Sequence, residues 1–200
     1  HRVRSNYETM RNMAERYDGY GFGIKKVMEQ QAVTSGIIGA VADIIKVEEK
    51  YETAIETALG GSIQNIVTDT QKTAKKMIEY LKKNRYGRVT FLPLDAVKGK
   101  EFARKEILLE PGVIGAANQL VIYDEVYKDL FASLLGQILV VKDMDAGIKI
   151  ANKYHHSVRI VTLDGDSLNR GGAMSGGAFK NKSNLLGRSR EVEELKKKLD

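Results

Sequence analysis

The two ends of the chain carry the same kind of segment, and the middle carries a different one. Near the N-terminus the apolar residues alternate between spacings of four and three, the a/d pattern of a coiled-coil helix; they are Val3, Tyr7, Met10, Ala14 and Tyr17. Near the C-terminus, residues 192, 195 and 199 (Val, Leu, Leu) repeat this spacing among Glu and Lys. Each of these two apolar patterns is shorter than the roughly three to four heptads that identify a coiled coil, so two ordinary amphipathic helices remain an alternative. Their symmetry favours one helix entering a globular body and one leaving it, paired antiparallel.

The middle of the chain alternates strand-like and helix-like segments. We expect strands at 36–47, bent at Gly39, and at 63–68, 88–92, 120–123, 137–141 and 158–163. We expect helices at 51–59, 69–83, 124–134 and 143–154, of which the second buries Ala74, Met77, Ile78 and Leu81. The predicted fold is therefore α/β, with two small mixed α/β subdomains flanked by short antiparallel coiled-coil helices.

The subdomain boundary is expected in the looser, Gly- and Pro-containing stretch 95–118. The resulting division has four parts: an incoming coiled-coil helix at 1–18, a first subdomain at 19–112, a second at 113–184 and an outgoing helix at 185–200.

Composition excludes several classes of protein. The chain has no Cys, so it has no disulfide, thiolate zinc site or cysteine nucleophile. No apolar run approaches the roughly 20 residues of a membrane helix. The first residue is not Met and no signal peptide is evident, so we expect a soluble, cytoplasmic piece of a longer protein.

The net charge of +6 comes from one stretch of the sequence. Residues 70–105 hold 11 basic and 3 acidic residues; the basic ones are Lys72, Lys75, Lys76, Lys82, Lys83, Arg85, Arg88, Lys98, Lys100, Arg104 and Lys105. Such a concentration indicates a polyanion partner, most often nucleic acid. The alternative is a solvated helix face followed by a Lys-rich loop.

Two glycine-rich segments resemble nucleotide-binding loops but lack residues that such loops need. The segment 19–23 lacks a preceding strand and a complete G-x-G-x-x-G, so it is better explained as a flexible joint. In the segment 171–177, Gly177 stands where a P-loop needs Lys, and Ala173 breaks the G-x-S-x-G frame around Ser175. Its four glycines permit close approach of another backbone, which suits a ligand, a tight turn or a subunit contact. A plain flexible loop is the alternative.

No catalytic set emerges from the remaining polar residues. His155 and His156 are adjacent and lack carboxylate or Cys neighbours at ligand spacing, so no metal site is expected. Asp164 and Asp166 flank Gly165 and are typical of a turn. With no nucleophile–base–orienter arrangement, the sequence argues against an enzyme.

Taken together, the segments resemble the hinge domain of structural maintenance of chromosomes (SMC) proteins, most closely the bacterial form. The resemblance covers nearly the whole chain. The segments that carry the resemblance are 19–25, 36–39, 51–61, 88–94, Val161-Thr162-Leu163-Asp164-Gly165-Asp166 and the glycine motif at 171–177. Arg170 departs from the family, which commonly has Pro before the first glycine of the motif.

The resemblance implies a homodimerisation module inserted midway along an antiparallel coiled coil of a chromosome-organising ATPase. It implies strand pairing between subunits, with the paired glycines Gly171, Gly172, Gly176 and Gly177 at the interface. It also implies weak, sequence-independent DNA binding near the coil junction, with Lys180, Lys182, Arg188 and Arg190 as candidates. Charge alone adds Lys72, Lys75, Lys76, Lys82, Lys83 and Arg85. The ATPase heads are expected outside this chain, so no cofactor, nucleotide or metal is expected, and the location is cytoplasmic and chromosome-associated.

A nucleotide- or small-ligand-binding α/β enzyme domain that uses the glycine loops remains the alternative class. That class predicts that a nucleotide raises the melting temperature.

Overall fold

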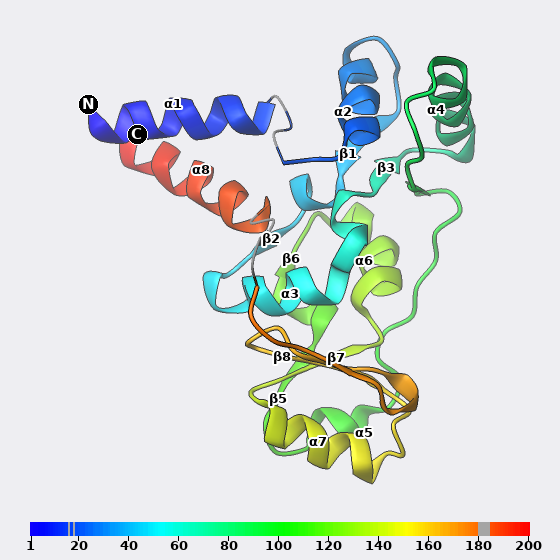
Figure 1. Cartoon of the computed structure of the whole chain (residues 1–200), viewed down its shortest axis with the longest axis vertical. Coiled ribbons are helices and arrows are strands. Elements are labelled where there is room, and N and C mark those ends of the chain that lie inside the picture. Colours follow the sequence, from blue (N-terminus) through cyan, green and yellow to red (C-terminus); the bar gives the residue numbers. More distant parts are fainter. Residues whose placement is uncertain (16, 18, 180–184) are drawn as a thin grey trace. The chain divides into compact units, whose positions relative to one another are not determined.

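A computed structural model describes residues 1–15, 17, 19–179 and 185–200, and is drawn in Figure 1. The chain forms two compact units that interleave in sequence. Unit 1 comprises 1–46, 61–97 and 183–200, and unit 2 comprises 47–60 and 98–182. These contact-based ranges differ from the division at 112/113 expected from sequence, which stays a prediction about the family's subdomains.

The terminal helices of unit 1 lie side by side. Helix α1 (Arg2–Glu15) and helix α8 (Leu185–Leu199) run antiparallel, and the two chain ends lie close together (Figure 1). Their contact confirms the predicted antiparallel pair of terminal helices.

The body of unit 1 is a three-stranded sheet in the order β1-β3-β4. Strand β1 (Ile37–Ala40) runs antiparallel to β3 (Ile66–Thr68), which runs parallel to β4 (Phe91–Pro93). Helix α4 (Gln71–Asn84) begins at Thr70, whose hydroxyl accepts the Thr73 N–H as a helix cap. Ala74, Met77 and Leu81 of α4 are buried as expected, but Ile78 is 39% exposed.

One expectation for unit 1 was wrong, and the bounds of another are narrower than expected. The strand expected at 36–47 is instead β1, a 3-10 turn (Val41–Asp43) and the two-residue β2 (Lys46–Val47), because Gly39 adopts φ +151° at a register shift. The joint expected at 19–23 is partly helical, since Gly21 caps helix α2 (Phe22–Glu29). Gly23 fits there because a Cβ would lie only 3.0 Å from the Tyr86 carbonyl oxygen.

Unit 2 is built on a five-stranded sheet in the order β10-β9-β8-β7-β5. Its strands are β5 (Val113–Ala116), β7 (Ile138–Val141), β8 (Arg159–Thr162), β9 (Ser167–Leu168) and β10 (Met174–Ser175). Strands β7 and β8 are parallel and the other pairs antiparallel. The strand β6 (Val121–Ile122) and helices α3 (Glu52–Leu59), α5 (Lys105–Leu108), α6 (Lys128–Leu135) and α7 (Met144–Lys153) complete the unit. The core includes Phe102, Ile107, Leu139 and Ile160. The stretch expected to be loose, 95–118, therefore contains α5 and β5.

The two halves of the chain repeat one order of elements. Strand, 3-10 turn, short strand, 3-10 turn, helix, strand, helix and strand occur in this order from β1 to β4 and again from β5 to β8, and the first half has one further 3-10 turn (Gly60–Gln64) after its first helix. Residues match at the same spacing: Gly36, Gly39, Tyr51 and Gly60 correspond to Gly112, Gly115, Tyr127 and Gly136. The two halves end differently, because the hairpin β9–β10 follows β8 and pairs with it, whereas β4 is the last strand of its sheet and is followed by helix α5.

Candidate functional site

The glycine motif surrounds an exposed strand at the edge of the unit 2 sheet. Gly171, Gly172 and Gly177 have φ values of +83°, +103° and +127°, which favour glycine, and a Cβ on any of them would meet no described atom within 4 Å. Packing against the described residues thus does not require a small residue at these three positions. Gly176 differs, because a Cβ there would collide with the Asp166 carboxylate.

Strand β10 presents its outer edge without a neighbouring strand in the described chain. It is the terminal strand of its sheet, both of its residues are exposed, and Met174 is 55% exposed. An unpaired edge offers backbone N–H and C=O groups to another chain. The motif therefore combines an open edge with glycines that admit a close backbone.

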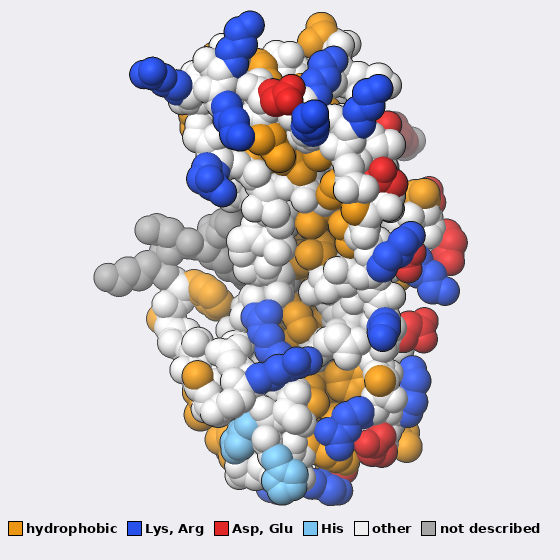
Figure 2. Space-filling view, turned by 90° about the vertical axis from the view of Figure 1, so that its right-hand side faces the viewer, with side chains coloured by type: hydrophobic (Ala, Val, Ile, Leu, Met, Phe, Trp, Pro, Cys, Tyr) orange, Lys and Arg blue, Asp and Glu red, His pale blue; other side chains and the backbone are white. Residues whose placement is uncertain are grey.

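The basic residues predicted from charge gather on helix α4 and its C-terminal end. All six are exposed: Lys72, Lys75, Lys76, Lys82, Lys83 and Arg85. Figure 2 shows Lys and Arg side chains gathered around α4 at the top of the view. Among described residues, only Lys75 forms an ion pair, and that pair to Glu79 is long at 4.0 Å. The structure thus brings these six candidates together as one cationic face, which we call the α4 face.

The arginine candidates near the coil junction are held by other contacts. The Arg190 guanidinium lies 3.1 Å from the Glu194 carboxylate and 4.0 Å from that of Glu191. The Arg188 guanidinium lies 5.9 Å from the centre of the Tyr20 ring. Lys180 and Lys182 fall outside the described residues. The DNA-binding role assigned to these four residues stays a prediction.

Tyr20 and Asp43 connect the coil junction to the body of unit 1. The buried Tyr20 hydroxyl donates a 3.0 Å hydrogen bond to the Asp43 carboxylate, and burial raises the pKa of Tyr20 above its ordinary value. Asp43 keeps solvent contact, yet desolvation of its carboxyl group raises its pKa, against the opposing effects of the Tyr20 hydrogen bond and the Arg188 charge. A second contact joins Lys46 to Glu193 of α8 at 2.9 Å. Arg188 thus lies beside the Tyr20–Asp43 pair at the root of α8.

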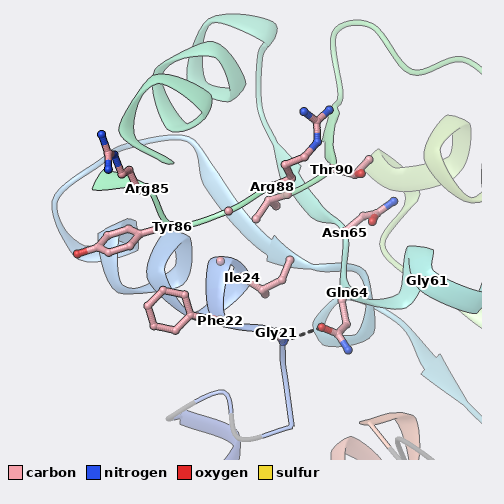
Figure 3. A pocket seen from close by; sticks show the side chains of 13 residues that line it. Gly21, Phe22, Ile24, Gly61, Gln64, Asn65, Arg85, Tyr86, Arg88 and Thr90 are labelled. Carbon is pink, nitrogen blue, oxygen red and sulfur yellow. Dashed lines mark hydrogen bonds between the residues drawn. The ribbon is translucent and has the colours of Figure 1, made fainter. Parts of the chain in front are cut away.

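A pocket of about 720 Å³ lies where α2 begins and where the chain enters β4 (Figure 3). Arg85 and Arg88 contribute its charged side chains, and no Asp or Glu is among the residues that line it. Phe22 and Tyr86 form an aromatic wall, with ring centres 5.5 Å apart, and the Lys26 ammonium lies over both rings. We call this the arginine pocket.

Sequence reasoning did not identify the arginine pocket. Its residues come from three separate stretches, 21–24, 61–65 and 85–90, and only folding brings them together. The excess of basic residues in 70–105 was the sequence signal that could have pointed to this pocket. It identifies a stretch of the sequence, however, and does not reveal a cavity.

The described residues offer neither a metal site nor a membrane-spanning helix. No group of three or more His, Asp or Glu in that part of the chain is placed to hold a metal ion. His155 and His156 are exposed and take left-handed conformations where α7 ends. No described helix combines the length and apolar character needed to cross a bilayer.

Comparison of the sequence with known proteins gives a consistent result. The family model for the SMC proteins Flexible Hinge Domain matches residues 34–151. The chromosome partition protein Smc of Desulfitobacterium hafniense is 43% identical over 202 residues, and that of Bacillus subtilis is 41% identical over 201 residues. Each match covers 98% of this chain but 17% of the relative, so the chain spans about a sixth of those proteins' length.

Solved structures agree with the sequence matches. An asymmetric dimer of the Geobacillus stearothermophilus SMC hinge domain matches with a TM-score of 0.92 and 41% identity, covering 99% of this chain and 81% of that one. The Pyrococcus furiosus SMC hinge domain matches with a TM-score of 0.67 and 31% identity, covering 89% and 91%.

Proposed function

This chain belongs to the SMC flexible hinge family, and from that membership we propose that it is a non-catalytic homodimerisation module. In the full-length protein it joins two long coiled-coil arms, and the ATPase heads lie outside this chain. The relatives are named chromosome partition proteins, and we extend to this chain their place on the bacterial chromosome.

The observation that carries this proposal is the open β10 edge inside the glycine motif. The Geobacillus stearothermophilus relative is described as a dimer, which supports pairing of two copies of this chain. An exposed strand edge next to glycines with empty surroundings suits a second backbone as its partner.

The unequal repeat suggests which edge receives β10. In unit 2 the strand β8 is covered by β9, whereas β4, which takes the place of β8 in the first half, ends its sheet uncovered. We therefore assign β4 of the partner copy as the receiving strand, so that a three-stranded and a five-stranded sheet join across the interface.

Sedimentation equilibrium tests the dimer directly. At micromolar concentration the wild-type chain is expected to give twice the 22.3 kDa mass of one chain. A single species at the monomer mass across that concentration range would remove the proposal.

A secondary DNA-binding activity is assigned to the α4 face. Six exposed cations on one surface suit contacts to phosphates, which carry no sequence information. Binding of this kind weakens steeply as salt rises, because each neutralised phosphate releases counterions.

Replacing Lys72, Lys76, Lys82 and Lys83 by Gln is expected to weaken binding of a duplex probe roughly 10- to 100-fold at low salt. The slope of log affinity against log salt should become shallower by about 3 to 4, since up to four phosphate contacts are lost. The matched control replaces four exposed lysines elsewhere by Gln: Lys105, Lys128, Lys142 and Lys149. Equal losses in the two variants would point to total charge and contradict a local site.

A further inference from the structure

The arginine pocket is a cavity with cationic side chains and no charge to balance them. Its volume of about 720 Å³ falls within the range of about 300–1,000 Å³ that is typical of small-ligand sites. The guanidinium groups of Arg85 and Arg88 form no hydrogen bond or ion pair within the described chain, and no Asp or Glu lines the cavity. All of the lining residues belong to unit 1 of a single chain. Two unbalanced guanidinium groups favour an anionic ligand.

A second cavity shows how the fold engages an arginine at the corresponding place of unit 2. This cavity, of about 440 Å³, lies where β7 and β8 begin, as the arginine pocket lies where β3 and β4 begin. There the Arg159 guanidinium donates to the carbonyls of Thr57 and Ala58 at 3.1 Å, so the C-terminal end of α3 holds its charge. The two arginines of the unit 1 pocket have no comparable acceptors among the described residues. They are therefore available to a ligand.

The first turn of α2 adds backbone donors to the arginine pocket. The first hydrogen bond of this helix joins the Lys25 N–H to the Gly21 carbonyl, so the N–H groups of residues 22–24 have no partner within the helix. These residues line the cavity, and the positive end of the helix dipole favours an anion there. The absence of a side chain at Gly23 lets the segment before β4 approach, because a Cβ would lie only 3.0 Å from the Tyr86 carbonyl oxygen.

An aromatic wall lies at one end of the pocket. The Phe22 ring is 60% exposed and meets the Tyr86 ring edge-on, with ring centres 5.5 Å apart. Figure 3 shows one arginine near each end of the cavity, with Arg85 beside this wall and Arg88 beside Thr90. A ligand that matches this arrangement has a flat apolar ring at one end and negative charge along the rest of its length.

Arg85 occupies a backbone position that does not favour its side chain. It follows α4 with φ +56°, in the left-handed region, where the end of a helix favours glycine. Its N–H satisfies the carbonyls of Leu81 and Lys82, which a glycine N–H would do equally well. The end of the helix therefore gains nothing from the long side chain, and the guanidinium group is left for a contact outside the helix.

We propose that the arginine pocket binds a nucleoside phosphate, with the base against the aromatic wall and the phosphates between the start of α2 and the two arginines. No carboxylate lines the pocket to hold the Mg²⁺ that sites of nucleotide hydrolysis use, so the ligand is bound as a free anion and is not turned over. The inference goes beyond the proposed dimer and does not depend on it. It departs from the expectation, implied by the family resemblance, that no nucleotide is bound.

Thermal unfolding and calorimetry of the whole chain with ATP and GTP, in buffer without Mg²⁺, test the pocket directly. At a free concentration ten times the dissociation constant, a bound triphosphate is expected to raise the melting temperature by about 3–6 °C. Added Mg²⁺ should weaken binding, because it neutralises the phosphates that the arginines contact. Inorganic tripolyphosphate should bind more weakly than ATP, since it has no ring for the aromatic wall. If neither ATP nor GTP binds, the proposal is overturned.

Two single substitutions separate the phosphate contact from the base contact. Arg88→Gln is expected to weaken the binding of ATP and of tripolyphosphate alike, roughly tenfold. Phe22→Leu keeps an apolar side chain but removes the ring, and should weaken ATP binding roughly five- to tenfold while leaving tripolyphosphate binding unchanged. Equal losses of both ligands in the Phe22 variant would contradict the placement of the base.

Arg85→Gly separates binding from folding. Glycine relieves the left-handed conformation at the end of α4, so this variant should unfold at an equal or higher urea concentration than the wild type. It should nevertheless bind ATP roughly tenfold more weakly, because one phosphate contact is lost. Unchanged ATP affinity in this variant would overturn the role assigned to Arg85.

Lys142→Gln is the matched control for charge, because it removes one exposed cation of unit 2 far along the sequence from the pocket. This variant should bind ATP as the wild type does, and a loss equal to that of Arg88→Gln would indicate general attraction and overturn the site. Binding of a single-stranded oligonucleotide but of neither triphosphate would assign the pocket to a nucleic-acid backbone, and would also overturn the proposal. Sedimentation without nucleotide reports on the proposed dimer separately, so failure of one proposal is distinguishable from failure of the other.

Discussion

A chain with alanine at positions 171, 172, 176 and 177 is expected to stay folded and to sediment as a monomer. At Gly171, Gly172 and Gly177 a Cβ would meet no described atom within 4 Å, so these methyl groups meet the partner's backbone. The methyl group at 176 also meets the Asp166 carboxylate of its own chain, a side-chain group that can turn away. Since paired strands lie only about 4.7–4.9 Å apart, methyl groups held at unfavourable φ separate the two edges. We expect the dimer dissociation constant to rise on the order of 100-fold or more, which corresponds to about 2.7 kcal/mol.

Circular dichroism and sedimentation equilibrium on the same sample separate loss of the interface from loss of the fold. Gly60→Ala is the matched control, because Gly60 also has a positive φ of +54° and no atom within 4 Å of a Cβ, but lies outside the motif. This control should carry the same kind of backbone strain and remain a dimer. A quadruple variant that is both folded and dimeric would show that the motif is not the contact surface.

Substituting Gly165 is expected to have the largest effect on stability of any single change considered. Gly165 is buried with φ +89°, and a Cβ there would lie 2.9 Å from atoms of Phe179, Thr53 and Thr57. Gly165→Ala combines a left-handed conformation, costing about 1–2 kcal/mol, with overpacking against α3, costing about 1–3 kcal/mol. The free energy of unfolding should fall by about 2–5 kcal/mol, and the urea midpoint by about 1–2 M.

Unfolding is compared at one protein concentration, because dimer formation adds a concentration-dependent contribution to stability. Gly61→Ala provides the control, since a Cβ at Gly61 meets no atom within 4 Å and its φ is not in the positive range. That variant should match or slightly exceed the wild type. If both variants unfolded alike, the contact between the 164–166 turn and α3 would not matter for stability.

Local signals predicted the regular elements well. The Thr70 cap and the spacing of Ala74, Met77 and Leu81 located α4, and the Asp143 cap, which accepts the Ala146 N–H at 2.9 Å, located α7. The prediction of one strand at 36–47 was wrong, because composition does not reveal that Gly39 breaks the strand at a register shift. The internal repeat was visible in the spacing of Gly36, Gly39 and Gly60 but was not recognised.

The candidate sites also differ in how far the sequence alone could predict them. The glycine motif and the α4 face are continuous in sequence or lie on one helix, so pattern alone could place them. The contact of Arg188 with Tyr20 and the arginine pocket depend on residues far apart in the chain. Only tertiary structure determines whether such a cation is engaged or lines a cavity.

The unequal ending of the two halves has a consequence for how many copies assemble. In the proposed dimer each chain offers the edge of β10 and accepts a strand at the edge of β4, so the contact joins unlike patches. Contacts of this kind either extend head to tail into a fibre or close on themselves. In the proposed dimer, two copies that exchange both strands pair each β10 edge with a β4 edge and leave neither of these edges free for a third molecule. In that dimer the hairpin β9–β10, which the second half of the chain has and the first half lacks, limits the joint to two copies.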